Sequence, residues 1–321
     1  MRVLGIDTSC DETSIALVER RRILAHIVHG QHALHERFRG VVPEIAARAH
    51  VERLLPALER VLASGAPEAV AVTNRPGLIG PLLVGLSAAK AFAFVKGLPL
   101  VAVHHLEAHA AAAYLLDPPP EPPFLALIAS GGHTLLYDVE ERGSYRRVGQ
   151  TLDDAAGECF DKVAALLGLP HPGGPAIERA GVGGDPAAFA LPRPLLDDKG
   201  DDFSFSGLKT AVLYLLRRQT PPLADVAASA QEAIADVLTH KAVRAARRLG
   251  RTRLVLGGGV AANTRVRELA AERARAAGID LFVPPRPLCT DNAAMIAVRG
   301  AELLEAGVRD TLAIDADPYS E

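Results

Sequence analysis

The sequence has few cysteines, no tryptophan and no excess of charge of either sign. Its three cysteines, Cys10, Cys159 and Cys289, form no close pair and no C-x-x-C motif. This argues against a disulfide framework and a thiolate zinc site, and it favours a reducing, cytoplasmic compartment. Lys and Arg total 35 against 38 Asp and Glu, so the net charge of -3 supplies no general basic field for nucleic acid or an anionic membrane. Any RNA contact must therefore be local.

Long uninterrupted apolar runs are also missing. The apolar run that begins the sequence ends at Asp7, before it is long enough to be the core of a signal peptide. The apolar stretches around 82–103 and 100–116 are interrupted, so neither offers the roughly 20 apolar residues of a membrane span, and we expect no membrane helix. The interrupting residues are Lys90, Lys96, His104, His105, Glu107 and His109.

The length and the strand pattern predict two similar lobes. A chain of 321 residues corresponds to two domains at about 100–200 residues each, and the proline-rich segment 117–123 is a stiff connector between them. Each half opens with strand, polar turn and strand, at 2–6 and 13–19 and again at 124–129 and 135–139. A glycine turn at 257–259 follows a later strand and leads into a helix from Asn263, as in anion-binding turns.

This pattern predicts an α/β protein with duplicated mixed-sheet lobes, of the actin, sugar-kinase and chaperone-ATPase (ASKHA) type. The expected domains are an N-terminal lobe over 1–117 and a C-terminal lobe over 124–321, with a helical insertion around 150–250.

Two histidines one helical turn apart form a candidate metal pair. His105 and His109 are at i and i+4, on one helix face, about 5–6 Å apart at Cβ. Glu107 lies about 200° round the helix from His105, which disfavours the zinc-peptidase mechanism of H-E-x-x-H. Asp291 is a possible third ligand at a loop-to-helix junction, and its alternative role is the N-cap of the last long helix. A His2Asp set suits iron or zinc as a Lewis acid.

A series of motifs, in order and over nearly the whole chain, closely resembles the bacterial TsaD family. The motifs are Gly5–Thr13, Gly40–Glu44, His105–His109, Ser130–Thr134, Asp154–Glu158, Phe160–Lys162, Phe205–Lys209, Gly257–Asn263 and Cys289–Asn292. The resemblance implies transfer of threonylcarbamoyl from threonylcarbamoyl-AMP to N6 of adenosine 37 in tRNAs that read codons beginning with A.

The resemblance also implies the site residues. It assigns one divalent metal per subunit, Fe(2+) with Zn(2+) as the alternative, to His105, His109 and Asp291. A nucleotide ligand, threonylcarbamoyl-AMP, AMP or ATP, would contact Ile128, Ala129, Ser130, Gly131, Gly132, Asp161, Gly174, Glu178 and Asn263. His133 either donates to the leaving phosphate or caps the turn.

Asp11 and Glu12 are our candidates for removing the proton from the attacking N6 amine, with orientation of the turn as the alternative. Three positions depart from the family pattern: Arg39 and Arg75 replace glycines, and His104 replaces an asparagine. At Arg75 we expect backbone strain, because a glycine at this position can adopt backbone angles that an arginine resists.

The implied partners are tRNA, a TsaB-type paralogue, a TsaE-type ATPase and a separate synthase that makes threonylcarbamoyl-AMP. The N-terminal lobe with helix 82–96 is the expected protein-binding surface, although its small residues also suit a core helix. Two basic runs are either tRNA contacts or solvated faces. They comprise Lys241, Arg244, Arg247, Arg248, Arg251 and Arg253, and Arg37, Arg39, Arg48 and Arg53.

Three other functions remain open on the residues alone. A metallopeptidase is disfavoured by the position of Glu107. A phosphotransferase of the same architecture is suggested by the glycine turns and by Asp7, but it has no use for the histidine pair. A non-catalytic ATP-binding scaffold is disfavoured by the complete His105, His109 and Asp291 set.

Overall fold

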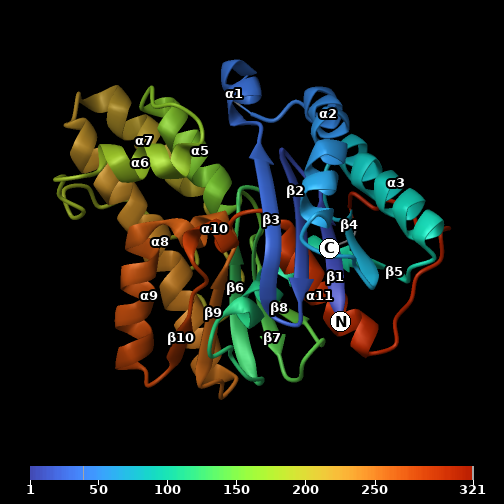
Figure 1. Cartoon of the computed structure of the whole chain (residues 1–321). Helices are drawn as coiled ribbons and strands as arrows, with labels where there is room; N and C mark the ends of the chain where they lie inside the picture. The colour runs from blue at the N-terminus through green and yellow to red at the C-terminus, as the bar shows by residue number, and fades with distance from the viewer. Residues whose placement is uncertain (39, 320–321) are drawn as a thin grey trace. The chain divides into compact units, whose positions relative to one another are not determined.

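The computed structural model describes residues 1–38 and 40–319, which form two compact units (Figure 1). The first comprises Met1–Pro119 and Asp291–Glu321, and the second Pro120–Thr290. This corrects the expected C-terminal lobe of 124–321, because its last segment belongs to the first unit. Helix α11 (Ala293–Glu305) packs against strands β1, β2 and β4 of that unit, a long-range contact with no local sequence signal.

A five-stranded mixed sheet forms the centre of the first unit. Its order is β3-β2-β1-β4-β5, with β1 (Arg2–Asp7) antiparallel to β2 (Glu12–Glu19) and parallel to β4 (Ala69–Arg75). The edge strands are β3 (Arg22–Gly30) and β5 (Leu100–His104). Strand β3 extends the first strand–turn–strand unit and was not among the strands expected from the sequence.

Helices cover both faces of this sheet. Helices α2 (Pro43–Leu62) and α3 (Ile79–Lys96) pack on β2 and β4 around a core that includes Leu4, Ile6 and Leu86. Helix α11 covers the opposite face. A Cβ at Gly5 would lie 2.1 Å from a carbonyl oxygen of α11, so only glycine permits this close approach. The shorter helices are α1 (His32–His35), η1 (Glu36–Phe38), α4 (His105–Ala111) and η2 (Ala112–Leu115).

The second unit repeats this topology. Its order is β10-β9-β6-β7-β8, in which β6 (Phe124–Ala129) is antiparallel to β7 (Thr134–Val139) and parallel to β9 (Arg253–Gly257). The outer strands are β8 (Arg146–Gln150) and β10 (Asp280–Phe282). The duplication expected from the two strand–turn–strand openings is therefore present in the structure.

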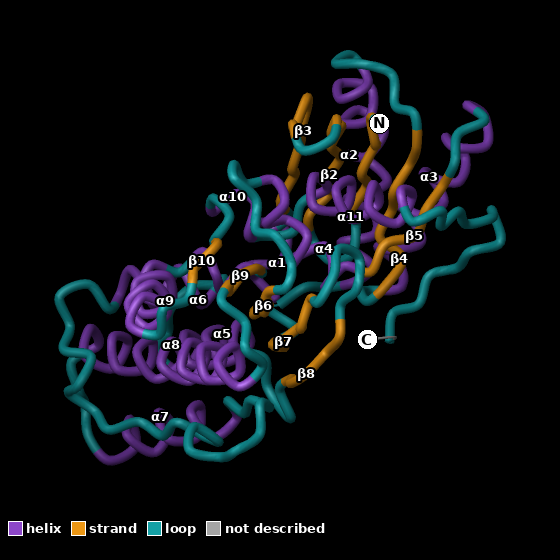
Figure 2. Tube along the Cα trace, turned by 90° about the horizontal axis from the view of Figure 1, so that it is seen from below, coloured by secondary structure: helices purple, strands orange, loops and turns teal. Residues whose placement is uncertain are grey.

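The helices between β8 and β9 gather on one side of the second sheet, as Figure 2 shows. They are α5 (Ala156–Leu166), α6 (Gly173–Ala180), α7 (Ser206–Arg218) and α8 (Leu223–Arg248). After β9 come η3 (Gly259–Ala262), α9 (Thr264–Ala276) and α10 (Arg286–Cys289). Aromatic residues Phe160, Phe203 and Phe205 are buried in this unit's core.

Helix α3 is the one helix, among the residues described, that is long and apolar enough to cross a membrane. Of the apolar segment of α3, 33% is buried. The buried side of the helix packs on the first sheet. Core helices of globular proteins have the same length and composition, so the helix is weak support for a membrane span.

Candidate metal centre and ligand turns

Strand β5 leads directly into α4, which carries the two predicted histidines. His104 ends the strand and caps the helix, because its Nδ1 accepts from the Leu106 N–H at 3.3 Å. His105 and His109 are 6% and 0% exposed, and their ring centroids are 4.7 Å apart. The helical spacing therefore brings them together as predicted, while His104 serves the helix N-terminus.

Asp291 meets both histidines. Its Oδ1 lies 3.4 Å from Nε2 of His105 and 3.2 Å from Nε2 of His109, and the three residues offer ligand atoms within 4.8 Å of one another. Asp291 does not cap the last helix, because Asn292 accepts from the Met295 N–H at 3.0 Å. The alternative structural role is thus filled by its neighbour.

The charges of this group oppose the effect of burial. Burial acts to raise the pKa of the Asp291 carboxyl, but the charge of His105 and contacts with both imidazoles hold that pKa well below its ordinary value. Burial acts to lower the pKa of His105, whereas Asp291 and Asp7 raise it well above the ordinary value. For His109 burial prevails, and its pKa is lowered. Among the described residues, neither ring nitrogen of His109 makes a hydrogen bond of full geometry, although its Nε2 lies within ion-pair distance of Asp291.

Glu107 faces away from this group. Its Oε2 accepts from Nε and Nη2 of Arg299 at 3.0 and 2.8 Å. The geometry agrees with the prediction that Glu107 cannot act on a water beside the histidine pair. It is the partner of a buried arginine.

Asp11, in the turn after β1, and Glu12, the first residue of β2, lie beside an imidazole. Nδ1 of His32 lies 3.3 Å from Asp11 Oδ2, and its Nε2 lies 3.7 Å from Glu12 Oε1. Burial raises the pKa of Glu12 well above its ordinary value, assisted by the nearby carboxylates. Burial also acts to raise the pKa of Asp11, but hydrogen bonding and charge from His32 lower it. The two carboxyls therefore favour different protonation states. The sequence pattern did not predict that His32 would lie beside these two carboxyls.

The predicted nucleotide contacts all belong to the second unit. Residues 128–132 span the end of β6 and its turn, where Ser130 N–H donates to the His133 carbonyl at 2.8 Å and the His133 N–H donates to Ser130 Oγ at 3.2 Å. The backbone of His133 thus closes this turn. A Cβ at Gly131 or Gly132 would meet no atom within 4 Å, whereas one at Gly258, with φ +85°, would lie 2.3 Å from the Ala129 carbonyl oxygen.

Four further predicted contacts, Asp161, Gly174, Glu178 and Asn263, lie on neighbouring helices or at a helix N-terminus. Asp161 on α5 accepts from the Gly173 N–H at 2.6 Å, and a Cβ at Gly174 would meet open space. Asn263 caps α9 by accepting from Val266 N–H, and its amide donates to Glu178 at 3.3 Å. The same amide donates to Gln231 at 2.8 Å. Gln231 was not predicted, because α8 meets α9 only in the folded chain.

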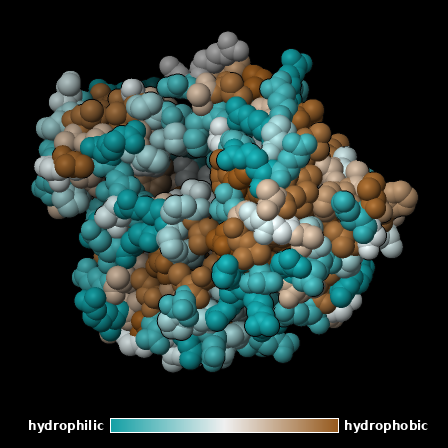
Figure 3. Space-filling model, in the orientation of Figure 1, coloured by the Kyte–Doolittle hydropathy of each residue, from teal (hydrophilic) through white to brown (hydrophobic). Residues whose placement is uncertain are grey.

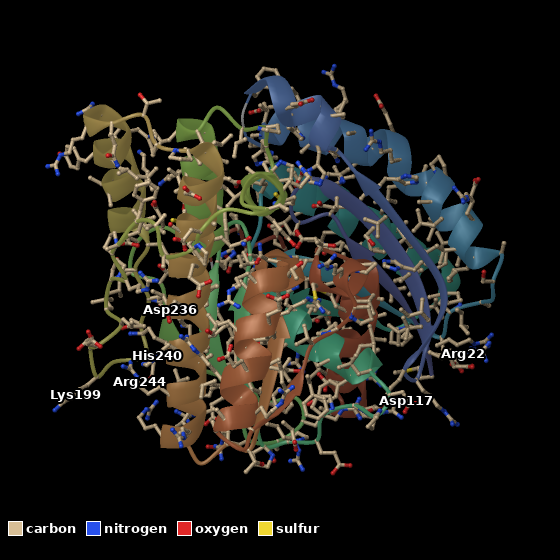
Figure 4. The ribbon with its side chains drawn as sticks, turned by 90° about the vertical axis from the view of Figure 1, so that its left-hand side faces the viewer. Arg22, Asp117, Lys199, Asp236, His240 and Arg244 are labelled. Carbon is tan, nitrogen blue, oxygen red and sulfur yellow. The ribbon has the colours of Figure 1, made fainter. Side chains whose placement is uncertain are left out.

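The densest basic run is largely paired within its own unit. Lys241 donates to the Leu195 carbonyl at 2.7 Å, and Arg248 forms an ion pair with Asp201. Arg251 donates to Asp138 at 2.6 and 2.9 Å. In the same run, Arg244 donates to the Leu196 and Gly200 carbonyls, and Arg253 to the Glu121 carbonyl. Figure 4 shows Asp236, His240 and Arg244 along α8, with the loop of Lys199 beside them. Lys241, Arg244 and Arg248 thus hold the loop 195–201 against α8.

The other basic positions are mixed. Arg53 donates to the Gly30 carbonyl at 3.0 Å, whereas Arg48 is exposed on α2. Arg39 and the side chain of Arg37 lie outside the described residues. Arg75 ends β4 in extended backbone, and the non-glycine residues with positive φ in the described chain are Arg20 and Leu195. The expected strain at Arg75 is therefore absent.

Sequence comparison identifies the family to which this geometry belongs. The family signature described as TsaD, tRNA N6-adenosine threonylcarbamoyltransferase, matches residues 22–298. A protein of that name from Anaeromyxobacter dehalogenans (strain 2CP-1 / ATCC BAA-258) is 54% identical and aligns over 99% of this chain and 98% of its own. The chain belongs to the TsaD family. The expected class of enzyme, a transferase that modifies adenosine N6 in tRNA, is thereby confirmed.

Solved structures support the fold of this TsaD-family chain. Full-length HypF matches with a TM-score of 0.66 at 14% identity, over 95% of this chain and 46% of HypF. The ROK hexokinase from Thermus thermophilus matches with a TM-score of 0.54 at 14% identity, over 96% of this chain and 100% of the hexokinase. Together with the two five-stranded sheets, these similarities confirm the predicted ASKHA architecture.

Proposed function

We propose that the chain transfers threonylcarbamoyl from threonylcarbamoyl-AMP to N6 of adenosine 37 in tRNAs that read codons beginning with A, with help from a divalent metal. The observation that carries the proposal is the convergence of His105, His109 and Asp291 in a TsaD-family chain. A cytoplasmic location follows from this substrate.

The donor set fits a metal. Two imidazoles and one carboxylate suit Fe(2+) or Zn(2+). The buried Nε2 of His109 makes no hydrogen bond of full geometry among the described residues, and it is a donor atom of the right kind. Such a metal would supply Lewis-acid polarisation of the carbonyl group that is transferred.

The donor substrate is a mixed anhydride, whose AMP is a good leaving group. The enzyme therefore contributes mainly orientation and electrostatic stabilisation. We assign its contacts to 128–132, Asp161, Gly174, Glu178 and Asn263. Support comes from the open space beside Gly131, Gly132 and Gly174, where the backbone of a glycine turn can approach a phosphate.

Asp11 and Glu12 are assigned to proton transfer. As N6 bonds to the carbonyl carbon, the carbon–oxygen bond to AMP breaks and N6 loses a proton. Both carboxyls lie beside His32, and together they are the acceptor that we assign to this proton.

The test is reconstitution with partner proteins, threonylcarbamoyl-AMP and unmodified tRNA, followed by mass spectrometry of the nucleosides. His109→Ala should abolish threonylcarbamoyladenosine. His240→Ala, which removes an exposed imidazole from α8, should leave the yield unchanged. Product from His109→Ala at the wild-type rate would refute the metal assignment. If even the wild type gave no product while a homologue was active, the transfer itself would be refuted.

The partners proposed are a TsaB-type paralogue, a TsaE-type ATPase and a separate synthase for threonylcarbamoyl-AMP. The N-terminal lobe offers an apolar surface for a protein partner, visible as brown atoms around α3 in Figure 3. Phe94 and Val95 are 72% and 77% exposed on α3, and Val51 and Leu55 are 62% and 61% exposed on α2. Phe94→Asp should weaken TsaB binding in a pull-down, whereas Tyr214→Asp on α7 should not.

A further inference from the structure

The two imidazoles of the candidate metal centre have different surroundings. Nδ1 of His105 lies 3.4 Å from Asp7 Oδ2 and 3.3 Å from Ser9 Oγ, on the side of the ring away from Nε2. Nδ1 of His109 has no hydrogen-bond partner among the described residues. Of the two imidazoles, only that of His105 therefore has a carboxylate beside its Nδ1.

Asp7 is itself poorly satisfied without this contact. It is 1% exposed, and its Oδ1 accepts from the Ser9 N–H at 3.1 Å. Its Oδ2 has no partner with full hydrogen-bond geometry in the described chain, and Nδ1 of His105 lies within ion-pair distance of it, at 3.4 Å. A buried carboxylate is costly unless a cation or donor compensates it.

The tautomer of His105 follows from this arrangement. A ring that offers the lone pair of Nε2 to a metal carries its proton on Nδ1. That proton points to an acceptor here, because Asp7 lies beside Nδ1 while Asp291 lies beside Nε2. Carboxylate partners of this kind fix ring orientation and raise the donor strength of a metal-bound histidine.

We propose that Asp7 is a positioning residue for the metal centre, which holds His105 with Nδ1 protonated and Nε2 directed to the metal, with Ser9 as an auxiliary acceptor. The inference rests on the proposed metal-binding role of His105, His109 and Asp291. It also links two parts of the site, since Asp7 begins the turn that carries Asp11 and Glu12.

The experiment measures Zn(2+) affinity of the purified full chain by competition with a chromophoric chelator. Asp7→Asn keeps the size of the side chain but removes its charge, and it should weaken Zn(2+) binding about 10- to 100-fold. Asp7→Glu restores a carboxylate and should recover part of the affinity. Ser9→Ala should have a smaller effect than Asp7→Asn.

Two other measurements separate the possible outcomes. Nitrogen-15 NMR of the histidine rings should show His105 as the Nδ1–H tautomer in the Zn(2+)-loaded wild type. If His105→Ala loses Zn(2+) but Asp7→Asn binds it as tightly as wild type, Asp7 merely shapes the turn and the inference is overturned. If both variants bind Zn(2+) like wild type, the metal centre is refuted and the inference falls with it.

Discussion

Replacement of Glu107 by glutamine tests whether this carboxylate is structural. Arg299 is 5% exposed and donates through two nitrogens to Glu107, while its third nitrogen lies 3.3 Å from Glu302. Removing one partner of a buried ion pair costs about 3–5 kcal/mol. The Glu107 side chain is 23% exposed, Glu302 remains, and a glutamine oxygen can still accept, so we expect a loss of about 1–2 kcal/mol.

That loss corresponds to a fall in melting temperature of about 3–6 °C for a unit of this size. Differential scanning calorimetry of Glu107→Gln measures it, with Glu305→Gln as the control, since Glu305 is exposed on α11, the helix that carries Arg299. Zn(2+) affinity and transfer at 25 °C should stay within twofold of wild type. Loss of Zn(2+) binding or of transfer without a change in melting temperature would refute this reasoning and restore a role for Glu107 in chemistry.

Three further predictions concern the second unit. Burial acts to raise the pKa of Asp236, but hydrogen bonds from Arg273 and Arg193 lower it. The ionised Asp236 therefore contributes to stability at neutral pH, and this contribution is lost as pH falls through the lowered folded-state pKa. Urea titrations should show Asp236→Asn about 1–3 kcal/mol less stable at pH 7 and equal to wild type at the acid end. Arg251→Gln removes two bonds to the buried Asp138 and should lower stability by about 2–3 kcal/mol, while filter-binding affinity for tRNA of the folded protein is unchanged. Gly258→Ala should unfold part of the unit, which circular dichroism would detect. Gly131→Ala should keep the wild-type melting temperature but weaken AMP binding measured by calorimetry.

The local patterns in the sequence were sufficient for most elements. The helical spacing of His105 and His109, and the glycine turn before Asn263, depend on neighbouring residues only, and both appear as predicted. Strand β3 was missed because it is an edge strand whose residues are half-buried on both faces, without a strict alternation of apolar and polar residues.

The features that sequence reasoning missed are non-local. The charges of Lys241 and Arg248 suggested a basic face, but their acceptors lie on a loop 46 and 47 residues away in sequence. Helix α11 joins the first unit through contacts with strands near the N-terminus, so the chain returns to its first lobe. Asp7 meets His105 in the same way, from the end of one strand to the start of a distant helix.

The duplicated topology explains how one chain provides two kinds of binding turn. The turn after β1 and the turn after β6 are topologically equivalent, since each joins the central strand of its sheet to an antiparallel neighbour. Carboxylates Asp7, Asp11 and Glu12 occupy the first turn, whereas Gly131 and Gly132 occupy the second. Carboxylates favour a cation, a metal or an imidazolium, while glycines expose backbone N–H groups to an anion. The backbone topology is thus common to both units, and we propose that the turn residues determine which charge each unit binds.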